Sequence, residues 1–250
     1  MSRWLAVLAV VGGLLGGCVT SQTGGLPQPA PKQERVRAYL DLARGLLNEG
    51  NLDRARDPLD RALALDPESV EAHVLKAVLS ENTGETGIAE SLYAQALRLD
   101  GDDAQALNNY GGFLLRQGRL EEALEKLRRS VEDPSYPRRS VAYENLGVAE
   151  LSAGNQPAAK LAFARALSLD ADLPRANLEL ASLEFAEGNS QIASDFYERY
   201  RLQARQTPKS LCLGINIARA LGDRDRLASF SIALRNLYPR SEEAKRCVGG

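Results

Sequence analysis

The chain has 250 residues, of which 44% are hydrophobic and 26% are charged, and 31 basic and 33 acidic residues give a formal net charge of −2. This balance excludes a disordered, highly charged chain and provides no basic field that would attract nucleic acid or an anionic membrane surface. A single histidine and three cysteines also disfavour a multi-ligand metal centre and histidine-based acid–base chemistry.

Residues 1–17 have the features of a lipoprotein signal peptide. A basic residue near the start precedes an apolar run that is too short to span a bilayer comfortably. The run ends in Leu-Gly-Gly-Cys at residues 15–18, a pattern that resembles a bacterial lipobox. This resemblance implies cleavage before Cys18 and attachment of acyl chains to that residue, which would anchor the protein firmly. The alternative is an ordinary secretory leader with an incidental cysteine.

Residues 18–33 comprise the acylated cysteine and a tether. The segment is rich in glycine and proline and has no apolar periodicity, which predicts a flexible linker that becomes stiffer where proline alternates. Val19 follows Cys18, so the aspartate that would retain a lipoprotein in the inner membrane is missing. In a Gram-negative cell this implies a lipid-anchored protein on the periplasmic face of the outer membrane.

The remaining residues, 34–250, contain an internal repeat. Related hexapeptides begin with glycine at positions 50, 84, 118, 154, 188 and 222, so the spacing is 34 residues with one interval of 36. This period is typical of tetratricopeptide repeats (TPRs), in which each unit is a pair of helices. We therefore predict an all-α, right-handed superhelix of six helix-turn-helix repeats with a short C-terminal capping helix. The repeats are expected at 36–69, 70–103, 104–137, 140–173, 174–207 and 208–241.

The long interval reflects a two-residue insertion in a proline-rich connection, residues 133–139, between the third and fourth repeats. Small residues also occur seven positions before each of the first five glycines, where they would let the two helices of a repeat approach closely. These residues are Ala43, Ala77, Gly111, Gly147 and Ala181.

The sequence contains no recognisable catalytic constellation. It lacks a phosphate-binding G-x-x-x-x-G-K-S/T loop, a G-x-S-x-G nucleophile elbow, an H-E-x-x-H pair and a C-x-x-C pair. We therefore expect a binding scaffold rather than an enzyme, with no cofactor, no metal, no nucleic acid and no small-molecule substrate.

TPR arrays line a concave groove with first-helix residues at positions 2, 5, 9, 12 and 13 of each repeat. In repeats 1 to 3 the residues that we expect to bind a partner are Arg37, Leu40, Arg44, Leu47, Val74, Val78, Asn108 and Leu115. Several of these are aliphatic and would face water in an empty groove, which is typical of a partner site. The alternative is that a bent superhelix buries them. A carboxylate clamp is disfavoured, because Glu144 stands beside Asn145 where such clamps carry lysine.

Three stretches go beyond generic TPR similarity: LNNYGGFL at 107–114, the Tyr-Pro insertion leading into YENLG at 143–147, and the segment 210–239. Together with the lipobox and six repeats, they resemble the PilF/PilW family of type IV pilus pilotin lipoproteins. The resemblance implies an outer-membrane lipoprotein that binds the secretin subunit and promotes its outer-membrane localisation and multimerisation. Pilus assembly and twitching motility would depend on it. The alternative is a TPR scaffold lipoprotein of another envelope assembly machine, for barrel insertion or polysaccharide export.

Cys212 and Cys247 are expected to form a disulfide. They are the two thiols that remain once Cys18 is acylated, and the expected compartment is oxidising. Cys212 lies in the first helix of repeat 6, and Cys247 lies in the capping helix that would pack beside it. The alternative is a pair of unpaired buried thiols.

Overall fold

The computed structural model describes residues 30–248, so the expected signal peptide, Cys18 and most of the expected tether lie outside the described residues. Within residues 30–248 the chain forms thirteen helices and no strand. The first helices of the six pairs are α1 (Lys32–Asn48), α3 (Val70–Asn82), α5 (Ala104–Arg116), α7 (Arg139–Ser152), α9 (Pro174–Ala186) and α11 (Pro208–Leu221). The second helices are α2 (Leu52–Leu65), α4 (Thr86–Leu99), α6 (Leu120–Ser130), α8 (Gln156–Leu169), α10 (Ser190–Gln203) and α12 (Arg224–Leu237).

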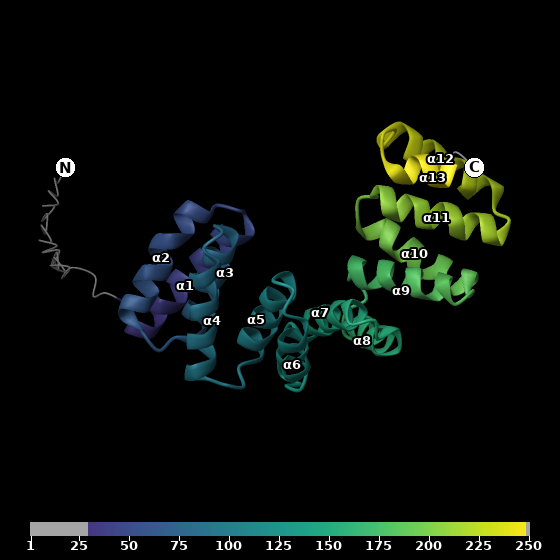
Figure 1. Cartoon of the computed structure of the whole chain (residues 1–250). Coiled ribbons are helices and arrows are strands. Elements are labelled where there is room, and N and C mark those ends of the chain that lie inside the picture. Colours follow the sequence, from purple (N-terminus) through teal and green to yellow (C-terminus); the bar gives the residue numbers. More distant parts are fainter. Residues whose placement is uncertain (1–29, 249–250) are drawn as a thin grey trace, which may run out of the picture.

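The pairs follow one another along an arc, and α13 (Glu242–Val248) lies against the last pair (Figure 1). The prediction of an all-α superhelical array of six TPRs with a capping helix is therefore confirmed. Helix α1 begins at Lys32, two residues inside the range expected for the tether, with Pro31 at its N-cap position. Proline is tolerated there because the first backbone N–H groups of a helix lack intrahelical acceptors.

The repeating glycines form the turn inside each helix pair. Gly50, for example, has φ of 72°, and the five equivalent glycines have φ between 71° and 87°. Glycine adopts this left-handed conformation without the steric cost that a Cβ would impose. The N–H of Asn51 then donates to the carbonyl of Leu46 at 2.8 Å, which closes the end of α1. The glycine period therefore sets the period of the helix pairs.

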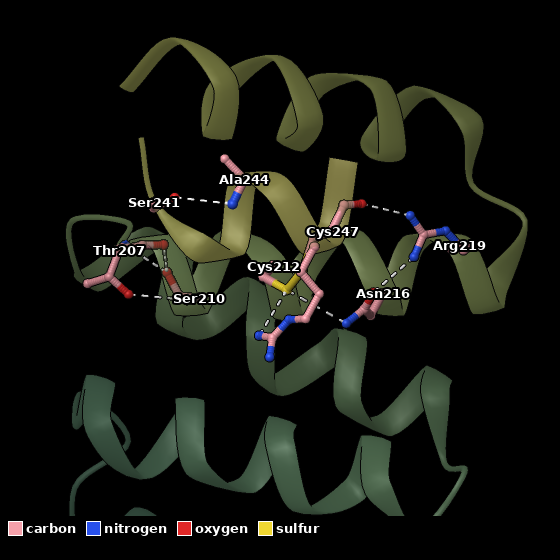
Figure 2. Close-up of a disulfide and its surroundings, with 9 residues drawn as sticks. Thr207, Ser210, Cys212, Asn216, Arg219, Ser241, Ala244 and Cys247 are labelled. Atoms are coloured by element: carbon pink, nitrogen blue, oxygen red, sulfur yellow. Dashed lines mark hydrogen bonds between the residues drawn. A yellow bond between two sulfur atoms is a disulfide. The ribbon is translucent and has the colours of Figure 1, made fainter. Parts of the chain in front are cut away.

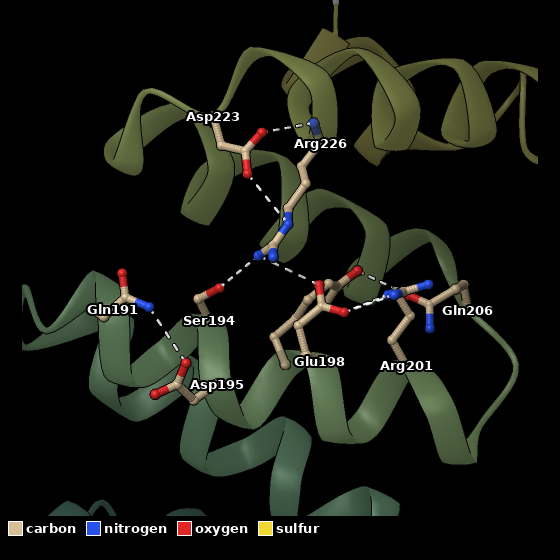
Figure 3. A network of polar contacts seen from close by, with 9 residues as sticks. Gln191, Ser194, Asp195, Glu198, Arg201, Gln206, Asp223 and Arg226 are labelled. Atoms are coloured by element: carbon tan, nitrogen blue, oxygen red, sulfur yellow. Dashed lines mark hydrogen bonds and ion pairs between the residues drawn. The ribbon is translucent and has the colours of Figure 1, made fainter.

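The hydrophobic core is a series of local clusters along the array rather than one central core. The first cluster joins α1, α2 and α3, and the last joins α11, α12 and α13. This arrangement is expected of a solenoid, in which each repeat is stabilised mainly by its neighbours. Polar contacts add to it between the last two repeats (Figure 3). Arg226 of α12 donates to the Ser194 hydroxyl at 3.0 Å and lies 3.6 Å from a Glu198 carboxylate oxygen, both on α10.

The third repeat departs from the others in its second helix. Helix α6 has 11 residues, whereas the five other second helices have 14. The chain then turns through the Pro-rich connection before α7 begins at Arg139. Tyr136 in this connection is 9% exposed and packs in a cluster with Leu127 and Leu146. The insertion is thus an ordered part of the array.

None of the helices within residues 30–248 combines the length and the apolar character that crossing a membrane requires.

Candidate partner-binding groove

The first helices of repeats 1 and 2 enclose one hollow of the groove, which we call the N-terminal hollow. Its volume is about 640 Å³. It is lined by Lys32, Gln33, Val36, Arg37, Leu40, Asp41, Arg44, Asp66 and Glu71. Most of these residues belong to successive turns of α1, so one face of that helix forms most of the lining. The N-terminal hollow therefore combines aliphatic side chains with charges of both signs.

A second hollow, which we call the central hollow, lies further along the groove and has a volume of about 420 Å³. It is lined by Arg44, Leu47, Asn48, Leu75, Val78, Gln105, Asn109, Tyr136, Pro137 and Arg138. Helices α1, α3 and α5 supply most of this lining, and the connection between α6 and α7 supplies the rest. Three repeats and the insertion therefore meet at one surface depression.

Five of the eight residues predicted to bind a partner line the two hollows. Arg37 and Leu40 line the N-terminal hollow, Leu47 and Val78 line the central hollow, and Arg44 lines both. The Leu40 side chain is only 5% exposed, because it also packs in the first core cluster. Arg37 and Arg44 are exposed, and Leu47 and Val78 are half-buried. These four side chains are therefore more accessible to a partner than Leu40.

Two predicted groove residues, Val74 and Asn108, are buried and line neither hollow, so the expectation that they face an open groove is wrong. Val74 has no exposed surface and packs with Tyr110 and Phe113 of α5, because adjacent first helices approach closely enough to cover it. Asn108 is 2% exposed and accepts a hydrogen bond of 3.0 Å from the Asn145 amide of α7. Burial by the bent superhelix, the alternative considered above, therefore applies to these two positions and largely to Leu40.

Leu115 lines neither the N-terminal nor the central hollow. It is half-buried and packs against both the second and the third core clusters. Its side chain therefore helps to join repeats 2 to 4, and a role in partner binding stays a prediction.

Three of the charged residues that line the groove form ion pairs with one another. Arg44 pairs with Glu71 and, at 2.9 Å, with Asp41, so its guanidinium links α1 to α3. By contrast, Arg37 and Arg138 form no ion pair with any other residue within 30–248. The central hollow has no acidic residue in its lining, so its net charge is positive.

Burial raises the pKa of the Tyr136 phenol, although the nearby Arg138 charge and a hydrogen bond with Asn108 oppose this effect. The phenol is therefore neutral at physiological pH. On α7, burial raises the pKa of Glu144, while the nearby Arg175 charge acts in the opposite direction.

Sequence reasoning missed four residues that line the central hollow: Leu75, Tyr136, Pro137 and Arg138. The available signal was the two-residue insertion at 133–139, which shows that the connection is unusual. Its contact with the groove of the three preceding repeats depends on the curvature of the array, which periodicity does not report.

Helix α13 closes the C-terminal end of the array, and Figure 2 shows how it is held. A disulfide joins Cys212 of α11 to Cys247 of α13, with the Cα atoms 5.7 Å apart. The Arg219 side chain also donates to the Cys247 carbonyl at 2.9 Å. Ala244 and Cys247 of α13 thus pack in one apolar cluster with residues of α11 and α12. Within residues 30–248 no group of three potential metal ligands comes together.

The chain is 39% identical to the type IV pilus assembly protein PilF of Pseudomonas aeruginosa, over 96% of this chain and 94% of that protein. A solved structure of P. aeruginosa PilF has a TM-score of 0.82 at 38% identity, covering 86% of this chain and 97% of its own. The crystal structure of PilW, described as a widely conserved type IV pilus biogenesis factor, has a TM-score of 0.71 at 26% identity, covering 84% of this chain and 97% of its own. Tetratricopeptide-repeat family profiles match residues 36–79 and 81–138. The chain therefore belongs to the PilF/PilW family of TPR proteins of type IV pilus biogenesis.

Proposed function

We propose that this protein is an outer-membrane lipoprotein pilotin that binds the secretin subunit of the type IV pilus through the groove of repeats 1 to 3. In this role it promotes secretin localisation and multimerisation in the outer membrane. The observation that carries the proposal is similarity to PilF along 96% of the chain, including the segment that contains the lipobox-like residues. The protein acts as a scaffold and not as an enzyme.

The groove suits a partner that must be kept from aggregating. Secretin subunits expose apolar surface and unpaired strand edges before they assemble, and such surfaces associate readily with one another. The N-terminal and central hollows offer aliphatic surface bordered by charges, which covers apolar side chains while keeping the carrier soluble. A carrier of this kind releases its cargo when subunits bind one another more tightly.

The proposed location at the outer membrane rests on the N-terminal residues. In the proposal, residues 1–17 are removed, acyl chains attach to Cys18, and the following tether holds the repeat array close to the periplasmic face of the outer membrane. More than one acyl chain gives stable anchoring, because each buried methylene contributes about 0.8 kcal/mol. In this proposal the lipid anchor keeps the protein at the membrane, and the groove binds the secretin subunit.

Capture of the secretin subunit by the purified full-length protein in detergent tests the groove. Leu47→Ser and Val78→Ser remove aliphatic surface from the central hollow and should together weaken capture. Ile88→Ser is the matched control, because Ile88 lies on the second helix α4 and is 53% exposed. Circular dichroism verifies that each variant is folded. Equal capture by the groove variant and the control would place the binding surface elsewhere.

A further inference from the structure

Three carboxamide side chains converge on the central hollow. Asn48 lies at the end of α1, while Gln105 and Asn109 lie one turn apart on α5. None of the three side chains forms a hydrogen bond with another residue within 30–248, although other asparagines of the array, such as Asn145, do so. A carboxamide offers both a donor and an acceptor, so it matches the N–H and C=O of a peptide group.

The same hollow has an aliphatic floor and an additional wall. Leu47, Leu75 and Val78 come from α1 and α3 and provide the floor. Tyr136 and Pro137 come from the connection that contains the two-residue insertion and provide the wall. Tyr136 is nearly buried, so this wall is held in place by the core between repeats 3 and 4. A single aliphatic side chain of a ligand would find apolar contacts on more than one side.

The charged residues that line the central hollow are all basic. Arg44 is already paired with Asp41 and Glu71, but Arg138 is exposed and has no ion-pair partner among residues 30–248. No acidic residue lines the hollow. A ligand that brings a carboxylate to Arg138 would form a charge-assisted hydrogen bond without displacing an existing pair.

We propose that the central hollow binds an extended segment of the secretin subunit in which an aliphatic residue neighbours an acidic residue. The carboxamides bind the main chain of the segment, the aliphatic floor takes the apolar side chain, and Arg138 takes the carboxylate. The segment is extended rather than helical, because a helix satisfies its main-chain groups internally and leaves none for the carboxamides. This inference rests on the proposed function and assigns the Tyr136–Arg138 connection to ligand selection.

The test uses immobilised, overlapping peptides that cover the secretin subunit, probed with the full-length protein in detergent. The wild-type protein should bind a peptide with an aliphatic residue next to Asp or Glu. Replacing Asn48 and Asn109 together by alanine should weaken that binding about tenfold, from the loss of two hydrogen bonds. Asn236→Ala on the exposed face of α12 is the matched control and should leave binding unchanged.

A charge swap tests the role of Arg138. The Arg138→Glu variant should lose the acidic peptide and regain binding when the acidic residue of the peptide is replaced by lysine. Arg165→Glu on the exposed side of α8 makes the same charge change away from the groove and should have no effect.

The possible failures are distinguishable. If the wild-type protein binds secretin peptides and both the double asparagine variant and Arg138→Glu bind them equally well, this subsite assignment is wrong while the proposed function stands. If no peptide binds and the intact subunit is not captured either, both are wrong. Capture of the intact subunit without any peptide binding would overturn the extended-segment assignment alone.

Discussion

Alanine at position 147 is expected to destabilise the fourth repeat, because the backbone of α7 packs directly against Phe163 of α8 there. A Cβ at Gly147 would lie 2.7 Å from both Cδ1 and Cε1 of Phe163, whose side chain is fully buried. Overpacking of this kind costs about 1–3 kcal/mol, and loss of a helix-interior glycine offsets about 0.5–1 kcal/mol. From the middle of each range, about 2 less about 0.75 kcal/mol, the expected net loss is about 1 kcal/mol.

Gly45→Ala is the matched control, since Gly45 lies inside α1 and a Cβ there would meet no atom within 4 Å. This variant should gain about 0.5–1 kcal/mol from helix propensity alone. Thermal unfolding followed by circular dichroism gives the direction of each change. Hydrogen exchange with peptide-level resolution locates it, because a repeat array opens locally. A Gly147→Ala protein at least as stable as the wild type, or a shift of the same sign in both variants, would refute the reasoning.

Three further predictions concern the C-terminal disulfide, one ion pair between α8 and α9, and the lipid anchor. Reduction of the Cys212–Cys247 disulfide should speed hydrogen exchange in α13, because a bond that spans 35 residues restricts the unfolded chain by about 4 kcal/mol in the entropy model; two alkylatable thiols in the unreduced protein would contradict it. The hydrogen bond from Lys160 lowers the pKa of Glu184, so this pair stabilises the fold above the unfolded carboxyl pKa of about 4.3, and the stabilisation is lost as pH falls through the lower folded value. Stability measured against pH should thus fall less steeply below about pH 4 in Glu184→Gln than in the wild type; equal slopes would show that the pair contributes nothing. Cys18→Ser should fold normally but leave the outer-membrane fraction, and persistence there on fractionation would exclude the lipid anchor.

Much of the fold could be predicted because one residue type marks each turn. Gly50 and its equivalents adopt a left-handed conformation that glycine tolerates best, so their spacing reports the helix pairs directly. Small residues such as Gly147 likewise mark where paired helices approach, as its near contact with Phe163 shows. These signals are local in the chain, and periodicity is sufficient to read them.

The groove could be predicted only in part, because its lining depends on how successive repeats pack. Val74 occupies a groove position in the repeat pattern, but α5 covers it. Tyr136 lies outside the repeat pattern, yet the insertion brings it to the groove of repeats 1 to 3. Both outcomes depend on the angle between neighbouring repeats, and side-chain volumes at many contacts set that angle together.

The central claim is that this protein binds the secretin subunit and is needed for its assembly in the outer membrane. The most direct measurement is the amount and membrane location of secretin multimers in a piliated bacterium that lacks this protein, with and without a wild-type copy restored. The account predicts unassembled subunits outside the outer membrane without the protein, and outer-membrane multimers once it is restored. Multimers of unchanged amount and location in the absence of the protein would contradict the account.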